Sequence, residues 1–110
     1  MTRHLLTDFE LMILLSILRN GDAAYGVTIA REIEQIGGRR AVLGAVYAAL
    51  ERLERNGLVS STVGEPTPER GGRAKRFFDV TTQGMRAVKE TQRALVALWQ
   101  GVPQLSKTSG

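Results

Sequence analysis

The chain changes its hydrophobic pattern after about residue 57, and this change constrains the fold more than any other feature. Up to about residue 57, apolar residues recur at helical spacing. Residues 58–63 and 76–81 are instead rich in β-branched and aromatic side chains, which favour strands. The stretch between them is rich in proline and glycine, which favour loops. The pattern therefore predicts a β-hairpin that follows a helical segment.

Three helices are predicted before the hairpin. In the first, Thr7 and Glu10 fit a capping box, and Gly21 is typical of a helix end in the left-handed conformation. The second is expected over about 24–36 and the third over about 44–56, each followed by glycine. Two short helices joined by a glycine-containing connector indicate a helix-turn-helix, and the hairpin behind them makes it a winged one.

The first helix and a last helix over 82–100 are predicted to form a dimer interface. The first is apolar nearly all round, so its second side needs a cover, most simply another subunit. The last has an apolar face and a charged face, and Pro103 is expected to end it. The candidate dimerisation residues are Phe9, Met12, Ile13, Met85, Val88, Leu95 and Trp99.

Composition excludes several function classes. The chain has 110 residues and no cysteine, so we expect one small domain with no disulfide, thiolate metal site or thiol nucleophile. Its single histidine, His4, lies near the N-terminus. No apolar run approaches the roughly 20 residues that cross a bilayer, and Asp8 and Glu10 interrupt any signal peptide. We therefore expect a cytoplasmic protein that is not an enzyme and needs no cofactor or metal.

The positive charge is concentrated in one part of the chain. The net charge is +4 and the isoelectric point is about 10.1. Within residues 70–76, Arg70, Arg73, Lys75 and Arg76 are accompanied by no acid. A basic patch of this kind fits a polyanion partner, whose phosphates or minor groove the loop would contact. The alternative is a solvated loop.

The third helix offers a small face to a partner. At roughly 100° per residue, Ala45, Ala48, Ala49 and Arg52 share one stripe that contains no carboxylate. Small side chains let a helix backbone enter the DNA major groove. Arg39 and Arg40 precede the helix, within reach of the sugar-phosphate backbone. The alternative is that this alanine-rich face packs against another helix.

These segments together resemble PadR-type transcriptional regulators. The resemblance covers about residues 5–100 and rests on YGV (25–27), GAVYAALERLE (44–54), NGLV (56–59), GGRAKRFF (71–78), Val80-Thr81 and Gly84. It implies a dimeric winged-helix repressor whose single C-terminal helix clasps the partner's N-terminal helix. It also implies that Tyr47 and its helix face DNA and that the basic residues of the hairpin touch the DNA backbone.

Some positions depart from the family pattern or admit two interpretations. Val42, Leu43 and Ala45 stand where many members have Ser, Pro or Thr, so readout of DNA shape is expected to carry more of the specificity. Tyr47 either contacts phosphate or is an aromatic at the edge of the core. Trp99 either belongs to the dimer core or lines a pocket for a small aromatic effector.

The sequence thus predicts a mainly α fold with a small β-hairpin, a winged helix-turn-helix with N- and C-terminal dimerisation helices. Residues 1–81 would form the DNA-binding domain, 82–103 the dimerisation helix and 104–110 a disordered tail. The expected partners are a pseudo-palindromic double-stranded DNA operator and a second copy of the chain. The rival is a protein-interaction module that dimerises without DNA. A third possibility is that the amphipathic last helix lies on a membrane surface. We expect a test of membrane binding to exclude this role.

Overall fold

The computed structural model describes residues 5–64 and 75–106. Its elements, in chain order, are α1 (Asp8–Asn20), the 3-10 turn η1 (Gly21–Ala23), α2 (Gly26–Gln35), α3 (Leu43–Arg55), β1 (Val59–Val63), β2 (Arg76–Val80), α4 (Thr82–Gln100) and α5 (Pro103–Ser106). The predicted fold class, mainly helical with an antiparallel hairpin in a winged-helix arrangement, is confirmed. None of the helices in these two ranges has the length and apolar character needed to cross a bilayer.

The first helix begins as predicted and ends differently. The Glu10 backbone amide donates to Thr7 Oγ1 at 3.2 Å, and the Thr7 amide donates to Glu10 Oε1 at 2.9 Å, which confirms the capping box. At the other end Gly21 has φ 56° and ψ −123°, so φ is positive but the residue is not in the left-handed helical region. The chain continues directly into η1 instead of ending in the expected cap.

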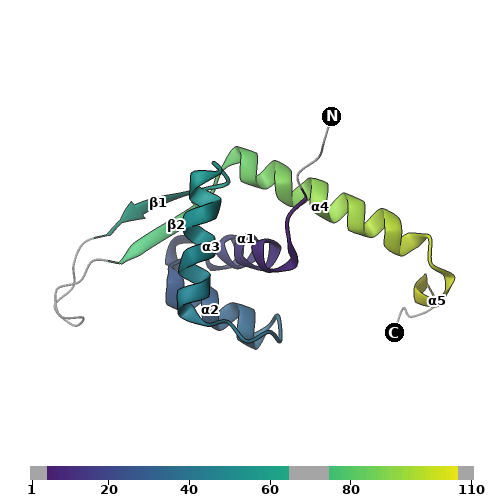
Figure 1. The fold of residues 1–110 in the computed structure, drawn as a ribbon, viewed down its shortest axis with the longest axis horizontal. Coiled ribbons are helices and arrows are strands. Elements are labelled where there is room, and N and C mark those ends of the chain that lie inside the picture. The colour runs from purple at the N-terminus through teal and green to yellow at the C-terminus, as the bar shows by residue number, and fades with distance from the viewer. Residues whose placement is uncertain (1–4, 65–74, 107–110) are drawn as a thin grey trace.

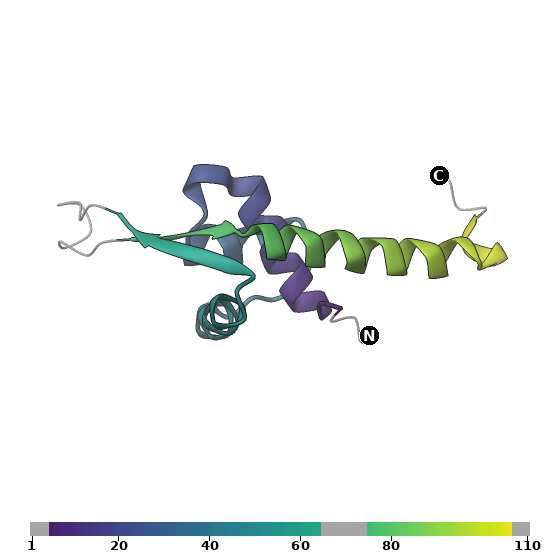
Figure 2. The ribbon, with the colours of Figure 1, turned by 90° about the horizontal axis from the view of Figure 1, so that it is seen from above.

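Helix α1 lies in the middle of the body and contacts α2, α3, β2 and α4 (Figures 1 and 2). Ile13 and Leu14 are completely buried there. The core around them also contains Ile29, Ile33, Val46, Leu50, Leu53 and Phe78. Leu15 and Leu18 remain 42% and 44% exposed, so the same helix also presents apolar side chains to solvent.

Helices α2 and α3 form the predicted helix-turn-helix within one or two residues of the expected bounds. Val46, Leu50 and Leu53 are buried, as their spacing predicts. The prediction that Ala49 belongs to the small face offered to a partner is wrong, because this residue is 1% exposed and packs in the core. On the helical wheel Ala49 stands only about 40° from Leu53, at the edge of the buried stripe. Ala45 and Ala48 are exposed as expected.

The hairpin pairs β1 with β2 antiparallel, from Val59 opposite Val80 to Val63 opposite Arg76. Each strand is one residue shorter than predicted. Toward the body, β2 is held on its other edge, because the Phe78 amide donates to the Ala24 carbonyl at 2.8 Å. The hairpin base is therefore fixed to the helix-turn-helix, and its far end points away from the body (Figure 1).

Helix α4 spans the predicted residues, and its first half packs against the body. It is capped by Thr81, whose Oγ1 accepts from the Gly84 amide at 3.0 Å. A Cβ on Gly84 would collide with the Leu58 carbonyl oxygen, so the start of α4 touches backbone. Further along, buried Thr91 accepts from the Leu6 amide at 3.0 Å. The first half of α4 is thus part of the same core as α1 and the hairpin base.

The second half of α4 projects from the body, opposite the hairpin (Figures 1 and 2). The chain measures 55 × 35 × 21 Å, and its radius of gyration is 16.0 Å, against about 13 Å for a compact chain of this length. The prediction of a disordered tail over 104–110 is wrong for its first residues, because α5 begins at Pro103, where proline favours a helix start. Residues 107–110 lie outside the described residues.

Candidate nucleic-acid interface

Helix α3 presents a small, basic face to solvent. Ala45, Ala48, Arg52 and Arg55 are all exposed. Within the part of the chain that the structure describes, neither arginine makes an ion pair. Glu51 is exposed on a neighbouring strip of the helix, beside Tyr47. The face that carries Ala45, Ala48 and Arg52 is therefore free of acids, as the sequence predicted, once Ala49 is removed from it.

The structure places Tyr47 at the edge of the core, and its contact with phosphate stays a prediction. Its ring lies against the first turn of α2, where a Cβ on Gly26 would stand 2.8 Å from Tyr47 Cε1 and closer still to the end of the ring. The side chain is nevertheless 39% exposed. Tyr47 is therefore a packing residue at the edge of the core that still faces solvent.

The two arginines before α3 differ in their surroundings. Arg39 Nη1 lies 3.1 Å from Asp8 Oδ2, and its Cζ lies 4.6 Å from the centre of the Phe9 ring. This arginine therefore joins the turn between α2 and α3 to the start of α1. Arg40 is exposed and makes no ion pair with the described residues. Of the two, Arg40 is the one whose charge is left for a partner.

The described basic residues of the hairpin are both held by the protein. Lys75 Nζ lies 4.4 Å from the centre of the Tyr25 ring and 3.5 Å from its hydroxyl, and Tyr25 stacks edge-on against Phe77 at 5.6 Å. Arg76 Nη2 lies 2.8 Å from Glu54 Oε1. Arg76 therefore differs from the free phosphate-contacting cation that the sequence suggested, because its charge is already paired. Arg70 and Arg73 lie outside the described residues.

The candidate dimerisation residues divide into buried and open ones. Ile13 is completely buried within its own chain, so its prediction is wrong: it has no surface to offer a partner. Val88 is also mostly buried in that core. Phe9, Met12 and Met85 are half-buried, whereas Leu95 and Trp99 are exposed on the projecting part of α4.

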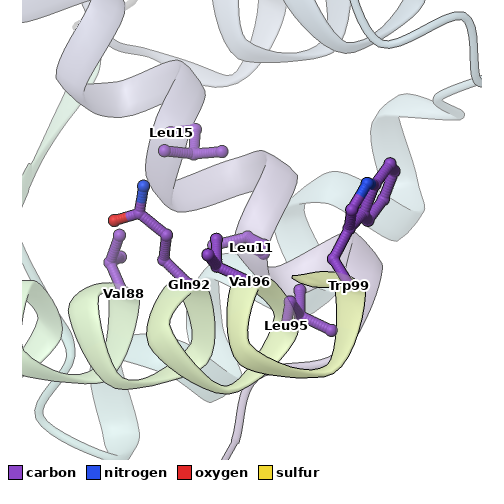
Figure 3. A pocket seen from close by; sticks show the side chains of 7 residues that line it. All are labelled: Leu11, Leu15, Val88, Gln92, Leu95, Val96 and Trp99. Carbon is purple, nitrogen blue, oxygen red and sulfur yellow. The ribbon is translucent and has the colours of Figure 1, made fainter. Parts of the chain in front are cut away.

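An apolar groove of about 330 Å³ runs between α1 and α4 (Figure 3). Leu11 and Leu15 line it from α1, and Trp99 stands at one end of the α4 side. The remaining lining residues are Val88, Gln92, Leu95 and Val96. Trp99 is 60% exposed, so in a single chain its indole lines the groove on one side and remains in contact with solvent on the other.

A second groove, of about 360 Å³, lies between α1 and α2. It is lined by Met12, Leu15, Ser16, Arg19, Glu32, Ile33, Ile36 and Gly37. Arg19 Nε and Glu32 Oε1 form an ion pair of 2.7 Å at its side. Leu15 lines both grooves, so the apolar surface continues across α1 from α2 to α4. An apolar surface of this extent is typical of an interaction site.

Several residues that hold the elements together carried no recognisable sequence signal. Glu54, Ser61 and Thr91 each make a contact whose partner is distant in sequence, and spacing rules apply only within one element. No group of three or more His, Cys, Asp or Glu side chains within 5–64 and 75–106 is arranged to hold a metal ion.

Comparison with known proteins gives the same fold. A PadR-like transcriptional regulator from Bacillus cereus strain ATCC 14579 is similar over 92% of this chain and 93% of its own, with 19% identity and a TM-score of 0.72. A transcriptional regulator from Clostridium thermocellum matches with 23% identity and a TM-score of 0.70, over 89% of this chain and 92% of its own. A PadR family transcriptional regulator from Eggerthella lenta DSM 2243 matches with 23% identity and a TM-score of 0.68, over 92% of this chain and 85% of its own.

Because these identities lie below 25%, the solved structures show the fold alone. Membership of a family is shown instead by a match to the sequence profile of that family. No curated protein matches the chain. The profile described as Transcriptional regulator PadR-like family matches residues 14–90, from the second turn of α1 to the middle of α4. The match includes the helix-turn-helix, the hairpin and the start of the projecting helix. The chain therefore belongs to the PadR-like family of transcriptional regulators.

Proposed function

We propose that this chain binds double-stranded DNA as a homodimer and represses transcription, in the cytoplasm and without a catalytic role. The observation that carries the proposal is the exposed face of α3, on which Arg52 and Arg55 lie unpaired among the described residues beside Ala45 and Ala48. An unpaired guanidinium on a narrow helix face suits a guanine edge in the major groove.

The proposed DNA contacts come from cations of α3, of the turn before it and of the hairpin. Arg52 would read a base edge, while Arg40 and Lys75 would contact phosphates on either side of α3. Lys75 must leave the Tyr25 ring or share it with a phosphate, since its ammonium lies over that ring in the free protein. Arg70 and Arg73 would add phosphate contacts. Arg39 and Arg76 would contribute less than their charges suggest, because each is already paired.

The dimer would use the apolar surface of α1 and the projecting half of α4. Large apolar side chains are exposed on these two helices, namely Leu15, Leu18, Leu95, Val96, Leu98 and Trp99, and Ile36 is exposed beside them at the end of α2. A helix that projects with such residues gains little from its own chain and much from a second copy. A two-fold axis would place the two α3 helices in successive major grooves of a pseudo-palindromic site.

The groove between α1 and α4 would also hold a small aromatic effector. Its volume of about 330 Å³ and its apolar lining suit such a ligand. Trp99 would stack on the ligand and report its binding through fluorescence, because it is the only tryptophan of the chain. An effector bound there would lie between the subunits and would change the distance between their α3 helices.

Fluorescence anisotropy with a labelled duplex from the promoter region upstream of the chain's own gene tests the proposal. We expect tight binding at low salt, and at moderate salt a clear preference for this duplex over a shuffled one of the same length. Sedimentation of the complex should give two chains per duplex. If the chain dimerises but ignores both duplexes at low salt, the rival function, a protein-interaction module, replaces this proposal.

A further inference from the structure

Glu54, Ser61 and Arg76 form a closed ring of polar contacts. Arg76 Nη2 donates to Glu54 Oε1 at 2.8 Å, and Arg76 Nε donates to Ser61 Oγ at 2.9 Å. The Ser61 hydroxyl donates in turn to Glu54 Oε2 at 2.7 Å. Both carboxylate oxygens of Glu54 are used, and the guanidinium points two donors in fixed directions. We call this set of three residues the hairpin lock.

The hairpin lock joins three elements, namely α3 and the two strands of the hairpin. Glu54 belongs to the last turn of α3, Ser61 to β1 and Arg76 to β2. In the strand register Ser61 lies opposite Phe78 and Val63 lies opposite Arg76, so Ser61 and Arg76 are diagonal neighbours on one face of the hairpin. The lock therefore connects both strands to the helix.

The position of the lock along the hairpin is informative. On one side of it, Phe78 is buried, and the Arg76 guanidinium lies 5.6 Å from the centre of its ring. On the other side, Val63 is 71% exposed. The lock thus stands at the boundary between the part of the hairpin that the core holds and the part that projects.

We propose that the hairpin lock fixes the angle between the hairpin and α3, and that Glu54 is a positioning residue for DNA recognition. This inference rests on the proposed DNA binding. Phosphate contacts set the register of a protein on a duplex, and base contacts supply its specificity. A hairpin free to swing would still find phosphates on any DNA, but it would no longer hold α3 in the register that matches one sequence.

The variant Glu54→Gln separates this role from simple electrostatics. The substitution keeps the shape of the side chain and raises the net charge by one unit. Charge alone therefore predicts tighter binding to every duplex. Loss of the lock instead predicts a smaller preference for the correct duplex, because the paired guanidinium loses its ionic partner. Charge alone leaves the preference between the two duplexes unchanged, so the preference distinguishes the two explanations.

Glu51→Gln is the matched control. Glu51 lies three residues earlier on α3, is exposed, and makes no ion pair within the ranges that the structure describes. Its substitution makes the same change in charge on the same helix without touching the lock. Arg76→Lys is the complementary variant, because it keeps the charge of position 76 and loses the two-pronged geometry.

The experiment measures anisotropy of the full chain on two duplexes, one that the wild type selects from a random library and a shuffled version of it. We expect Glu54→Gln and Arg76→Lys to lower the preference for the selected duplex about fivefold, a typical size for coupled contacts. Binding of Glu54→Gln to the shuffled duplex should be unchanged or tighter. Glu51→Gln should keep the wild-type preference, and the thermal midpoint of each variant records whether the fold has suffered.

A wild-type preference in Glu54→Gln overturns the inference, and so does an equal loss in Glu51→Gln. If Glu54→Gln does not fold, Ser61→Ala takes its place with the same expectations. If the wild type selects no duplex, the proposed function fails, and amide hydrogen exchange tests the lock alone. Faster exchange in β1 and β2 of Glu54→Gln, but not of Glu51→Gln, then supports it, and equal exchange overturns it.

Discussion

The ring of Tyr47 on α3 occupies the space in which a Cβ on Gly26 of α2 would stand. The two helices of the helix-turn-helix therefore approach one another through one glycine and one tyrosine. Both residues lie within the segments that carry the family resemblance, and this contact gives a physical reason for finding them together. Because Tyr47 is still partly exposed, one side chain both sets the helix spacing and faces solvent.

Gly26→Ala should destabilise the protein by about 1–3 kcal/mol, the usual cost of overpacking. The new methyl group would overlap the ring of Tyr47. Urea unfolding followed by circular dichroism measures the loss. Gly44→Ala is the control, since a Cβ on Gly44 meets no atom within 4 Å, and alanine in a helix should be neutral or stabilising there. Equal effects of the two substitutions would contradict the packing argument.

Tyr47→Phe should leave the unfolding midpoint nearly unchanged, because the ring that packs on Gly26 is retained. DNA binding should weaken about two- to tenfold on every sequence, as expected for the loss of one hydrogen bond to phosphate. Anisotropy titrations on the promoter duplex and on a shuffled duplex measure both effects. Unchanged affinity would leave Tyr47 as a packing residue only.

Replacing Arg73 and Lys75 together by alanine should weaken binding to all duplexes. It should also reduce the slope of log K against log salt by about 0.9 for each phosphate that the variant no longer neutralises. Arg86→Ala with Lys89→Ala removes the same charge from the exposed side of α4 and is the control. If both pairs change the slope equally, the hairpin has no special place in DNA binding.

Trp99→Ala should shift the monomer–dimer equilibrium toward monomer by at least about tenfold, because a large aromatic at an interface is often a major contributor to binding. Sedimentation equilibrium over a range of protein concentrations measures the shift. Val63→Ala is the control, since Val63 is an exposed apolar residue at the end of β1, and the hairpin and the second half of α4 extend to opposite sides of the body (Figure 1). A dimer of unchanged affinity in Trp99→Ala would remove the projecting helix from the interface.

In the wild type, Trp99 should also report the effector. If the groove between α1 and α4 binds aromatic molecules, a panel of them should quench or shift the emission of this single tryptophan. The measurement is a fluorescence titration of the dimer. Absence of any change across the panel would contradict the effector proposal and leave the dimer proposal untouched.

Features set by local sequence were predicted well. The capping box of Thr7 and Glu10, the hairpin and the 82–100 helix each depend on residues close together in the chain. The sequence does not predict the short α5. Pro103 is interpreted only as the end of the preceding helix, but proline also favours the first position of a new helix.

Features set by packing between elements were predicted less well. Periodicity shows that α1 is apolar on all sides, but it does not show which side faces the chain's own core, and Ile13 was placed on the wrong side for this reason. Charge counting likewise treats Arg76 as a free cation. Its partner Glu54 is distant in the sequence, and only the fold brings the two side chains together.

Selection of DNA by the wild type and by Arg52→Ala from the same random library tests the central claim most directly. The account predicts that the wild type selects two half-sites related by two-fold symmetry, with centres about one helical turn, or roughly 10 base pairs, apart or a multiple of that. Arg52→Ala should lose the base preference at one position in each half-site and keep the spacing. An unchanged selected sequence, or a site without symmetry, would contradict the claim that paired α3 helices read DNA.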